Sequence, residues 1–150
     1  MRARLRVRAL VLSLLLVVQF FAGMITNLYI VIPPRHPGAN AHSYLAGAAR
    51  SVGWAITSGR FWLAVHAALG MLLAVGSVEL IVVAARSRSV RWIWLSVAGC
   101  AFLIGAGFNG ASFLVFGRDL SSLIMAGLFG LSLASYVVAL YADGRRPSGA

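Results

Sequence analysis

Residues 61–85 read FWLAVHAALGMLLAVGSVELIVVAA, and this stretch decides which class of fold the chain adopts. It is apolar almost throughout, with one histidine, His66, and one acidic residue, Glu79. About 20 apolar residues are enough for a helix to cross the hydrocarbon core of a bilayer. The stretch also lacks the apolar–polar alternation of a membrane-barrel strand. Because a helix pairs its backbone polar groups internally, the sequence predicts a membrane-spanning helix here.

Three other stretches share this character. They are residues 9–32, 92–117 and 120–142, and none of them contains a charged residue. The first continues well beyond the apolar core of a cleavable signal peptide, so we expect it to remain as an anchor. Two of the three connections are short, which predicts antiparallel packing of neighbouring helices. We therefore predict an all-α integral membrane protein, a single domain over residues 1–150 with four transmembrane helices in an up-down bundle.

The composition of the 150 residues excludes several other classes of protein. Hydrophobic residues make up 61% of the chain and charged residues 11%, and the mean hydropathy is +0.90. A soluble domain carries about 25% charged residues, and a globule of this size has too little interior to bury so much apolar surface. With a single cysteine, Cys100, no disulfide can form within the chain. A soluble enzyme, a disordered chain and a disulfide-stabilised secreted fold are therefore excluded.

The distribution of the basic residues predicts the orientation in the membrane. The formal net charge is +10, and all 13 basic residues are arginines. One side of the predicted bundle has Arg2, Arg4, Arg6, Arg8, Arg86, Arg88, Arg91, Arg145 and Arg146, and the other side has Arg35, Arg50, Arg60 and Arg118. Basic residues are enriched in cytoplasmic loops, so we expect a multi-pass plasma-membrane protein with both termini in the cytoplasm. The partner of this charge is then the lipid bilayer, and we expect no nucleic-acid partner.

The connection formed by residues 33–60 is the one long loop, and it is predicted on the outer side. It opens with Pro33 and Pro34, which block a helix at that point. Residues 41–57 then show an amphipathic pattern, which predicts a short helix. The apolar face of that helix would contain Leu45, Ala48, Ala49, Val52 and Ile56, with Trp54 outside it. We expect this helix to lie on the membrane surface, and the alternative is a lid over the bundle.

Polar side chains within the spans are candidates for function, because they are costly in lipid. One residue from each span falls in the outer half of the membrane, namely Asn27, His66, Asn109 and Ser122. Gln19 lies two turns before Asn27 on the same face of the first span. These groups either converge on the bundle axis to form a site or only hydrogen-bond between helices.

His66 is the residue with the most alternative roles. Neutral imidazole binds metal ions, haem iron among them, and can carry protons. His36 and His42 lie in the loop on the same side, so three histidines are candidates for a metal site, although their spacing matches no metal motif. A haem would need Met24, Met125 or a loop histidine as its second axial ligand. The alternative is a structural, hydrogen-bonded histidine.

Glu79 lies near the inner boundary and on a different helix face from His66, because thirteen residues correspond to about 220° of rotation. We expect its carboxyl group to pair with Arg86, Arg88 or a neighbouring helix. The alternative is a proton or ion site that opens to the cytoplasm.

Small residues repeat at four-residue spacing in the third span, a pattern that lets transmembrane helices pack closely. The set is Gly105, Gly107, Gly110 and Ala111. We expect these residues to contact a membrane-protein partner or a second copy of the chain.

The sequence contains no Walker, HExxH or GxSxG motif and only three acidic residues, so neither a hydrolase nor a kinase is expected. The main hypothesis is a non-enzymatic accessory or partner-binding bundle. One alternative is a membrane redox protein that binds haem or a quinone through His66, with His36, His42, Asn27 and Asn109 as further candidate binding residues. The other alternative is a small transporter or channel.

Overall fold

The computed structural model describes residues 2–144, which form five helices and no strand. The helices are α1 (Arg2–Tyr29), α2 (Tyr44–Thr57), α3 (Phe61–Arg86), α4 (Val90–Phe116) and α5 (Asp119–Gly144). Four of them, α1, α3, α4 and α5, are long and apolar enough to cross a membrane. The predicted all-α class and the four long apolar helices are therefore confirmed. The first helix begins at Arg2 and ends at Tyr29, so both ends come earlier than in the predicted span 9–32. The helix ends ahead of Pro33 and Pro34 because proline disfavours a helix at the residue before it.

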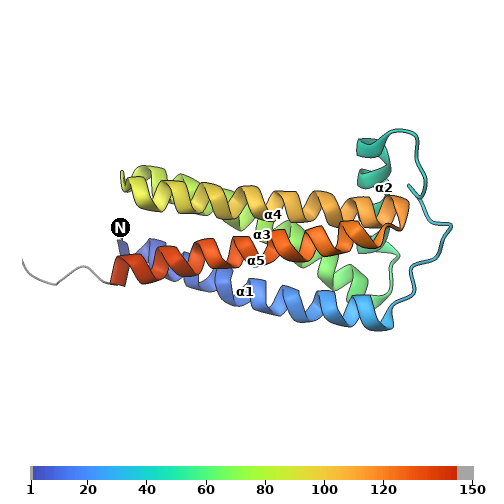
Figure 1. Ribbon diagram of the computed structural model, residues 1–150, viewed down its shortest axis with the longest axis horizontal. Helices are drawn as coiled ribbons and strands as arrows, with labels where there is room; N and C mark the ends of the chain where they lie inside the picture. The colour runs from blue at the N-terminus through green and yellow to red at the C-terminus, as the bar shows by residue number, and fades with distance from the viewer. Residues whose placement is uncertain (1, 145–150) are drawn as a thin grey trace, which may run out of the picture.

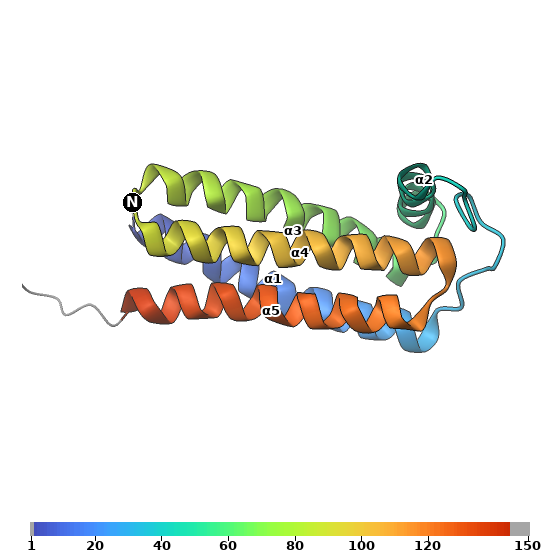
Figure 2. The same ribbon diagram turned by 45° about the horizontal axis from the view of Figure 1, so that its top comes forward.

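The four long helices form a ring in which α1 packs on α3, α3 on α4, α4 on α5, and α5 on α1. Consecutive long helices run in opposite directions, as Figures 1 and 2 show. The start of α1, the turn between α3 and α4, and the end of α5 share one end of the ring. At the other end lie α2 and the loop before it (Figure 1).

Two tight turns join α3, α4 and α5. In the first, Arg88 adopts a positive φ of 55°, and the Ser87 hydroxyl group accepts a hydrogen bond from the Ser89 amide at 3.3 Å. In the second, Gly117 ends α4 at a φ of 65°, a left-handed conformation that glycine adopts without a steric penalty. These short turns bring each pair of helices together in antiparallel contact.

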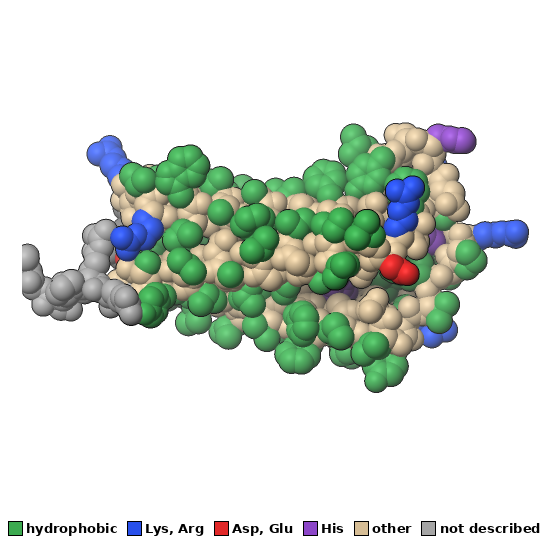
Figure 3. Space-filling view, in the orientation of Figure 1, with side chains coloured by type: hydrophobic (Ala, Val, Ile, Leu, Met, Phe, Trp, Pro, Cys, Tyr) green, Lys and Arg blue, Asp and Glu red, His purple; other side chains and the backbone are tan. Residues whose placement is uncertain are grey.

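Large apolar side chains are more numerous on the outside of the ring than within it (Figure 3). The interior combines leucines with small and polar residues, among them the fully buried Ser77, Ser96 and Ser132. A soluble monomer rarely exposes such a continuous apolar surface. Bundles in lipid use small residues and interhelical hydrogen bonds inside instead. The four long helices and this distribution indicate a membrane protein.

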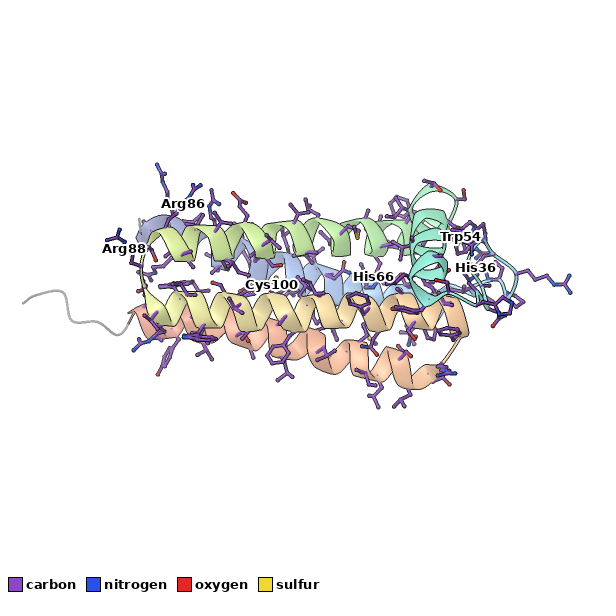
Figure 4. The ribbon with its side chains drawn as sticks, turned by 90° about the horizontal axis from the view of Figure 1, so that it is seen from above. His36, Trp54, His66, Arg86, Arg88 and Cys100 are labelled. Carbon is purple, nitrogen blue, oxygen red and sulfur yellow. The ribbon has the colours of Figure 1, made fainter. Side chains whose placement is uncertain are left out.

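The short helix α2 crosses the axis of the bundle at the end opposite the turn between α3 and α4, and packs against α3 and α4 (Figure 4). Its buried residues are Gly47, Ser51 and Ala55, whereas Leu45 and Ile56 are exposed. The helix is confirmed, and Leu45 and Ile56 of the predicted apolar face point away from the bundle. Small residues face inward because the backbones approach closely: a Cβ atom on Gly47 would lie 3.2 Å from the carbonyl oxygen of Gly38.

Candidate functional site

The imidazole ring of His66 points from α3 into the ring of helices and rests on the backbone of α1 (Figure 4). A Cβ atom added to Gly23 would lie 2.9 Å from His66 Cε1 and 3.2 Å from His66 Nδ1. Only glycine at position 23 therefore leaves room for the ring. The histidine is placed by this contact between two helices.

Gln19 lies one helical turn from Gly23 and links α1 to α3. Its side-chain Nε2 donates a hydrogen bond to the backbone carbonyl oxygen of His66 at 3.0 Å. The same nitrogen would lie 3.2 Å from a Cβ atom on Gly70. The polar face of α1 and the His66–Gly70 face of α3 thus meet. We call Gln19, Gly23, His66 and Gly70 the His66 cluster.

Gly107 on α4 lies near the level of the His66 cluster. Ser77 on α3 contacts Cys100 on α4. Because the two helices are antiparallel, seven residues back from Ser77 and seven residues forward from Cys100 lead to Gly70 and Gly107 at one level. Gly107 is exposed, and a Cβ atom there would meet no atom within 4 Å. The chain therefore leaves α4 uncovered at Gly107.

Two buried polar atoms in the His66 cluster have no hydrogen-bond partner in the described part of the chain. They are His66 Nδ1 and Gln19 Oε1. The backbone carbonyl of Gln19 is the acceptor group beside the ring. Gln19 thus faces His66 with both its side chain and its backbone.

Of the two arrangements left open for the four polar residues, convergence on the bundle axis does not form, because Asn27 and Asn109 point elsewhere. Asn27 is exposed on the outside of α1. Asn109 donates from Nδ2 to the Gly105 carbonyl oxygen of its own helix at 2.9 Å. Ser122 is half-buried at the start of α5, whereas its neighbour Ser121 is buried and bonds the Ser112 hydroxyl group at 3.4 Å. Asn27, Asn109 and Ser122 therefore do not surround His66.

The three histidines do not form a metal site. Among residues 2–144 no three histidine, cysteine or acidic side chains are grouped so that they could hold a metal ion. His36 instead stacks on Trp54 with ring centroids 4.6 Å apart, and its Nε2 contacts the carbonyl oxygen of Leu114 at 3.1 Å (Figure 4). His42 is exposed. Trp54, which falls outside the predicted apolar face, thus packs against the loop before α2.

The loop before α2 is fixed to the end of α4 by further contacts that the sequence did not reveal. The Asn40 amide donates to the carbonyl oxygen of Val115 at 2.9 Å. The hydroxyl group of Tyr44 donates to the Phe108 carbonyl oxygen at 2.6 Å, and its ring stacks on Phe108 and Phe116. Partial burial raises the pKa of Tyr44. The Val115 carbonyl is one of those that the end of a helix leaves without a partner, whereas Phe108 lies within α4.

A second group of buried polar side chains, missed by the sequence analysis, lies nearer the other end of the bundle. The Ser77 hydroxyl group donates to Cys100 Sγ at 3.2 Å, and Ser132 donates to the Gly99 carbonyl oxygen at 2.8 Å. Tyr136 is completely buried on Gly99, where an added Cβ atom would lie 2.5 Å from its ring. We call these five residues the Tyr136 cluster. In the sequence, the four-residue spacing of Ser132 and Tyr136 places both residues on one face of a helix, and this spacing was the one sign of the cluster.

Glu79 forms an ion pair with Arg8 of the adjacent helix α1. Both side chains are exposed by more than a third, Arg8 by 39% and Glu79 by 60%. The expected partner on a neighbouring helix is therefore present, whereas Arg86 and Arg88 as partners are wrong. The reason is direction: α1 begins beside the end of α3, so its arginines reach Glu79 from the side (Figure 1).

The small residues predicted to bind a partner are used mostly within the chain. A Cβ atom on Gly105 would lie 3.1 Å from Leu128, one on Gly110 would lie 2.9 Å from Met125, and Ala111 is buried. The outward small residues are on α5 instead. Ala126, Gly127, Gly130 and Ala134 are exposed, and Cβ atoms on the two glycines would meet nothing within 4 Å.

Comparisons with protein-family models, with curated proteins and with solved structures gave no match. Function must therefore be inferred from the residues of this chain alone.

Proposed function

We propose that the chain is a four-span, up-down bundle of the plasma membrane that binds a partner membrane protein as a non-enzymatic accessory subunit. The four long apolar helices and their apolar exterior support the membrane part of the proposal. The arginine distribution supports cytoplasmic termini. Arg86, Arg88 and Arg91 share one end of the bundle with the start of α1, whereas Arg145 and Arg146 lie outside the described residues.

The observation that carries the partner-binding role is the open small-residue face of α5, made of Ala126, Gly127, Gly130 and Ala134. Small residues allow the backbones of two transmembrane helices to come close, which favours packing and weak hydrogen bonds. None of the helices within residues 2–144 covers the two glycines, since Cβ atoms there would meet nothing within 4 Å. The face lies along the middle of a long apolar helix, where only lipid or another transmembrane helix can reach it.

The segments outside the long helices are small, which also supports a transmembrane helix as the partner of the α5 face. The two tight turns expose only a few residues, and the long loop is bound to the end of α4. Little surface is left for a soluble partner. We therefore assign the α5 face to a transmembrane helix of another membrane protein.

Photo-crosslinking in membranes of cells that produce the protein tests this proposal. A photoreactive amino acid at Gly127 should form one discrete adduct, and Gly130→Ile should abolish it because the added side chain blocks close helix approach. Ala101→Ile, an exposed substitution on α4, is the matched control and should leave the adduct intact.

Three outcomes would contradict the proposal. They are lipid adducts only, an adduct that survives Gly130→Ile, or an adduct with twice the mass of the chain. The last result would assign the α5 face to a second copy rather than to a different protein.

A further inference from the structure

The seam where α1 packs on α3 carries a group of charged side chains near the start of α1. Arg8 of α1 forms an ion pair with Glu79 of α3, so these two residues lie at one level. Arg4 precedes Arg8 by one turn on the same face of α1. Arg86 follows Glu79 by two turns on the same face of α3 and lies at the end of the bundle where α1 begins (Figure 4). Arg4 and Arg86 are exposed, and we call Arg4, Arg8, Glu79 and Arg86 the seam cluster.

Arg4 and Arg86 lie close enough along the bundle for one ligand to contact both. At about 1.5 Å per residue, Arg4 lies about 6 Å from the level of the ion pair, and Arg86 lies about 10.5 Å from it in the same direction. The two levels therefore differ by only about 4.5 Å, which is less than the length of an arginine side chain. The helices are in contact beside them, since a Cβ atom on Gly76 would lie 3.0 Å from Leu12 Cδ2.

The seam cluster carries more positive than negative charge. Its three arginines and one glutamate leave a formal charge of +2, because Glu79 neutralises only one arginine. Asp143, at the same end of the bundle, accepts a hydrogen bond from Trp92 Nε1 at 3.3 Å and lies where α4 meets α5. Within residues 2–144, Arg4 and Arg86 form no ion pair. Two guanidinium groups on one seam are therefore available to an anion.

The depth of the ion pair makes its exposure unfavourable in a membrane. Glu79 is seven residues from the end of α3, about 10.5 Å along the helix, and its side chain is more than half exposed. A hydrocarbon core of about 30 Å ends within about 5 Å of each end of a helix as long as α3. The pair therefore faces the edge of the hydrocarbon, where exposed charges are costly unless a polar group covers them.

We propose that the seam cluster binds the phosphate group of an anionic phospholipid, with Arg4 and Arg86 as the two guanidinium contacts. Arginine donates pairs of N–H groups in a geometry that matches phosphate oxygens. Basic sites between transmembrane helices at the cytoplasmic side are typical of sites for anionic headgroups. This inference rests on the membrane part of the proposed function, but not on the partner that binds α5.

Apolar side chains next to the seam cluster suit the acyl chains of the same lipid. Val11 follows Arg8 by about one turn on α1 and is exposed. On α3, Val75 and Leu72 precede Glu79 by one and two turns, and both are exposed. Acyl chains can therefore lie along the seam while the phosphate stays at its charged end. This continuity of charged and apolar surface favours a lipid over a free phosphate ion.

Glu79 competes with the lipid for Arg8 in this arrangement. Its carboxylate already binds the Arg8 guanidinium group. The neutral amide of Glu79→Gln would release that group to a phosphate and raise the charge of the seam cluster. Glu79→Gln should therefore strengthen lipid binding several-fold, whereas a carboxylate needed only to hold α1 against α3 would have the opposite effect.

Native mass spectrometry of the full chain in detergent micelles tests the proposal. Phosphatidylglycerol and phosphatidylcholine are titrated separately, and the lipid-bound fraction gives a dissociation constant for each. We expect one phosphatidylglycerol molecule to bind about tenfold more tightly than phosphatidylcholine, because only the former has a net negative charge. Arg4→Gln and Arg86→Gln should each weaken phosphatidylglycerol binding about tenfold, as expected for the loss of a charged hydrogen bond.

The matched control is Arg6→Gln, which removes an exposed arginine from the same end of α1. Two residues turn a helix by about 200°, so Arg6 lies on the flank of α1 away from Arg4 and Arg8. Arg6→Gln should bind phosphatidylglycerol as the native chain does. Glycerol phosphate, which has the headgroup chemistry without acyl chains, should compete at least a hundredfold more weakly than the lipid.

Four results would overturn the proposal. They are equal affinity for the two lipids, equal affinity of the Arg4→Gln and Arg6→Gln variants, weaker binding by Glu79→Gln, and competition by glycerol phosphate as effective as that of the lipid. The last result would assign the seam cluster to a free phosphate ester.

Failure of the lipid site and failure of the proposed function can be distinguished. Gly130→Ile, which should abolish the adduct on α5, should bind phosphatidylglycerol as the native chain does. Arg4→Gln should in turn keep the adduct on α5. Release of the chain from cell membranes by alkaline carbonate would overturn both proposals, because both require a chain that spans the membrane.

Discussion

The His66 cluster and the Tyr136 cluster occupy the same ring of helices but differ in packing. In the Tyr136 cluster a complete aromatic ring covers Gly99, and its residues are buried. In the His66 cluster the imidazole ring rests on Gly23 of α1, and Gly107 near the same level of α4 is exposed with nothing within 4 Å of an added Cβ atom. The difference is therefore one of packing: the first region holds a complete ring between α4 and α5, and near the second region α4 is left uncovered.

The largest effect is expected from removing the ring that fills the sealed region. Tyr136→Ala should lower the free energy of unfolding by about 3–5 kcal/mol, because it leaves a large cavity between α4 and α5. Unfolding in mixed micelles with increasing denaturing detergent measures this loss. Tyr29→Ala removes a ring that is 72% exposed and should change the stability little. Similar losses in the two variants would show that Tyr136 does not hold the helices together.

A smaller effect should separate the polar groups of the two clusters. Ser132→Ala removes the hydrogen bond to Gly99 and should cost about 1 kcal/mol. Gln19→Met also removes one hydrogen bond, but it eliminates the buried Oε1 atom that has no partner. Its net change should therefore stay within about 0.5 kcal/mol of zero. The same unfolding assay compares them, and a larger loss for Gln19→Met would reverse the assignment of the two regions.

The smallest effect on global stability is expected at the loop that covers the end of α4. His36→Ala removes the stacking on Trp54 and the contact with Leu114. Amide hydrogen exchange should become about tenfold faster in the loop and in α2, with no change in α3 or α5. His42→Ala changes an exposed histidine and should leave exchange as it is. Uniform exchange in both variants would mean that His36 does not fix the loop.

The sequence predicts the four long helices well, because their length and apolar character are local properties that lipid requires. It also predicts that Gln19 and Gly23 share one face and that His66 and Gly70 share another. The relative rotation of the helices is not local, so the meeting of these two faces and the outward direction of Asn27 could not be predicted. The same reason hides the contact of Tyr136 with Gly99, which links residues 37 positions apart.

The orientation of α2 shows a second limit of sequence patterns. An amphipathic pattern identifies an apolar face, but it does not show what surface that face meets. Here the surface is the backbone at Gly38 together with Val115, and only small residues come close enough to it. Gly47, Ser51 and Ala55 therefore face inward, and Leu45 faces out.

The contrast between a sealed and an open region is tested most directly by one substitution at two glycines of α4. Gly99→Ala places a Cβ atom 2.5 Å from the buried ring of Tyr136, so it should lower the free energy of unfolding by about 1–3 kcal/mol. Gly107→Ala meets no atom within 4 Å and should leave the stability unchanged or slightly higher, because alanine favours a helix more than glycine does. Equal losses at both positions would contradict the contrast, since they would mean that α4 is as tightly packed at Gly107 as at Gly99.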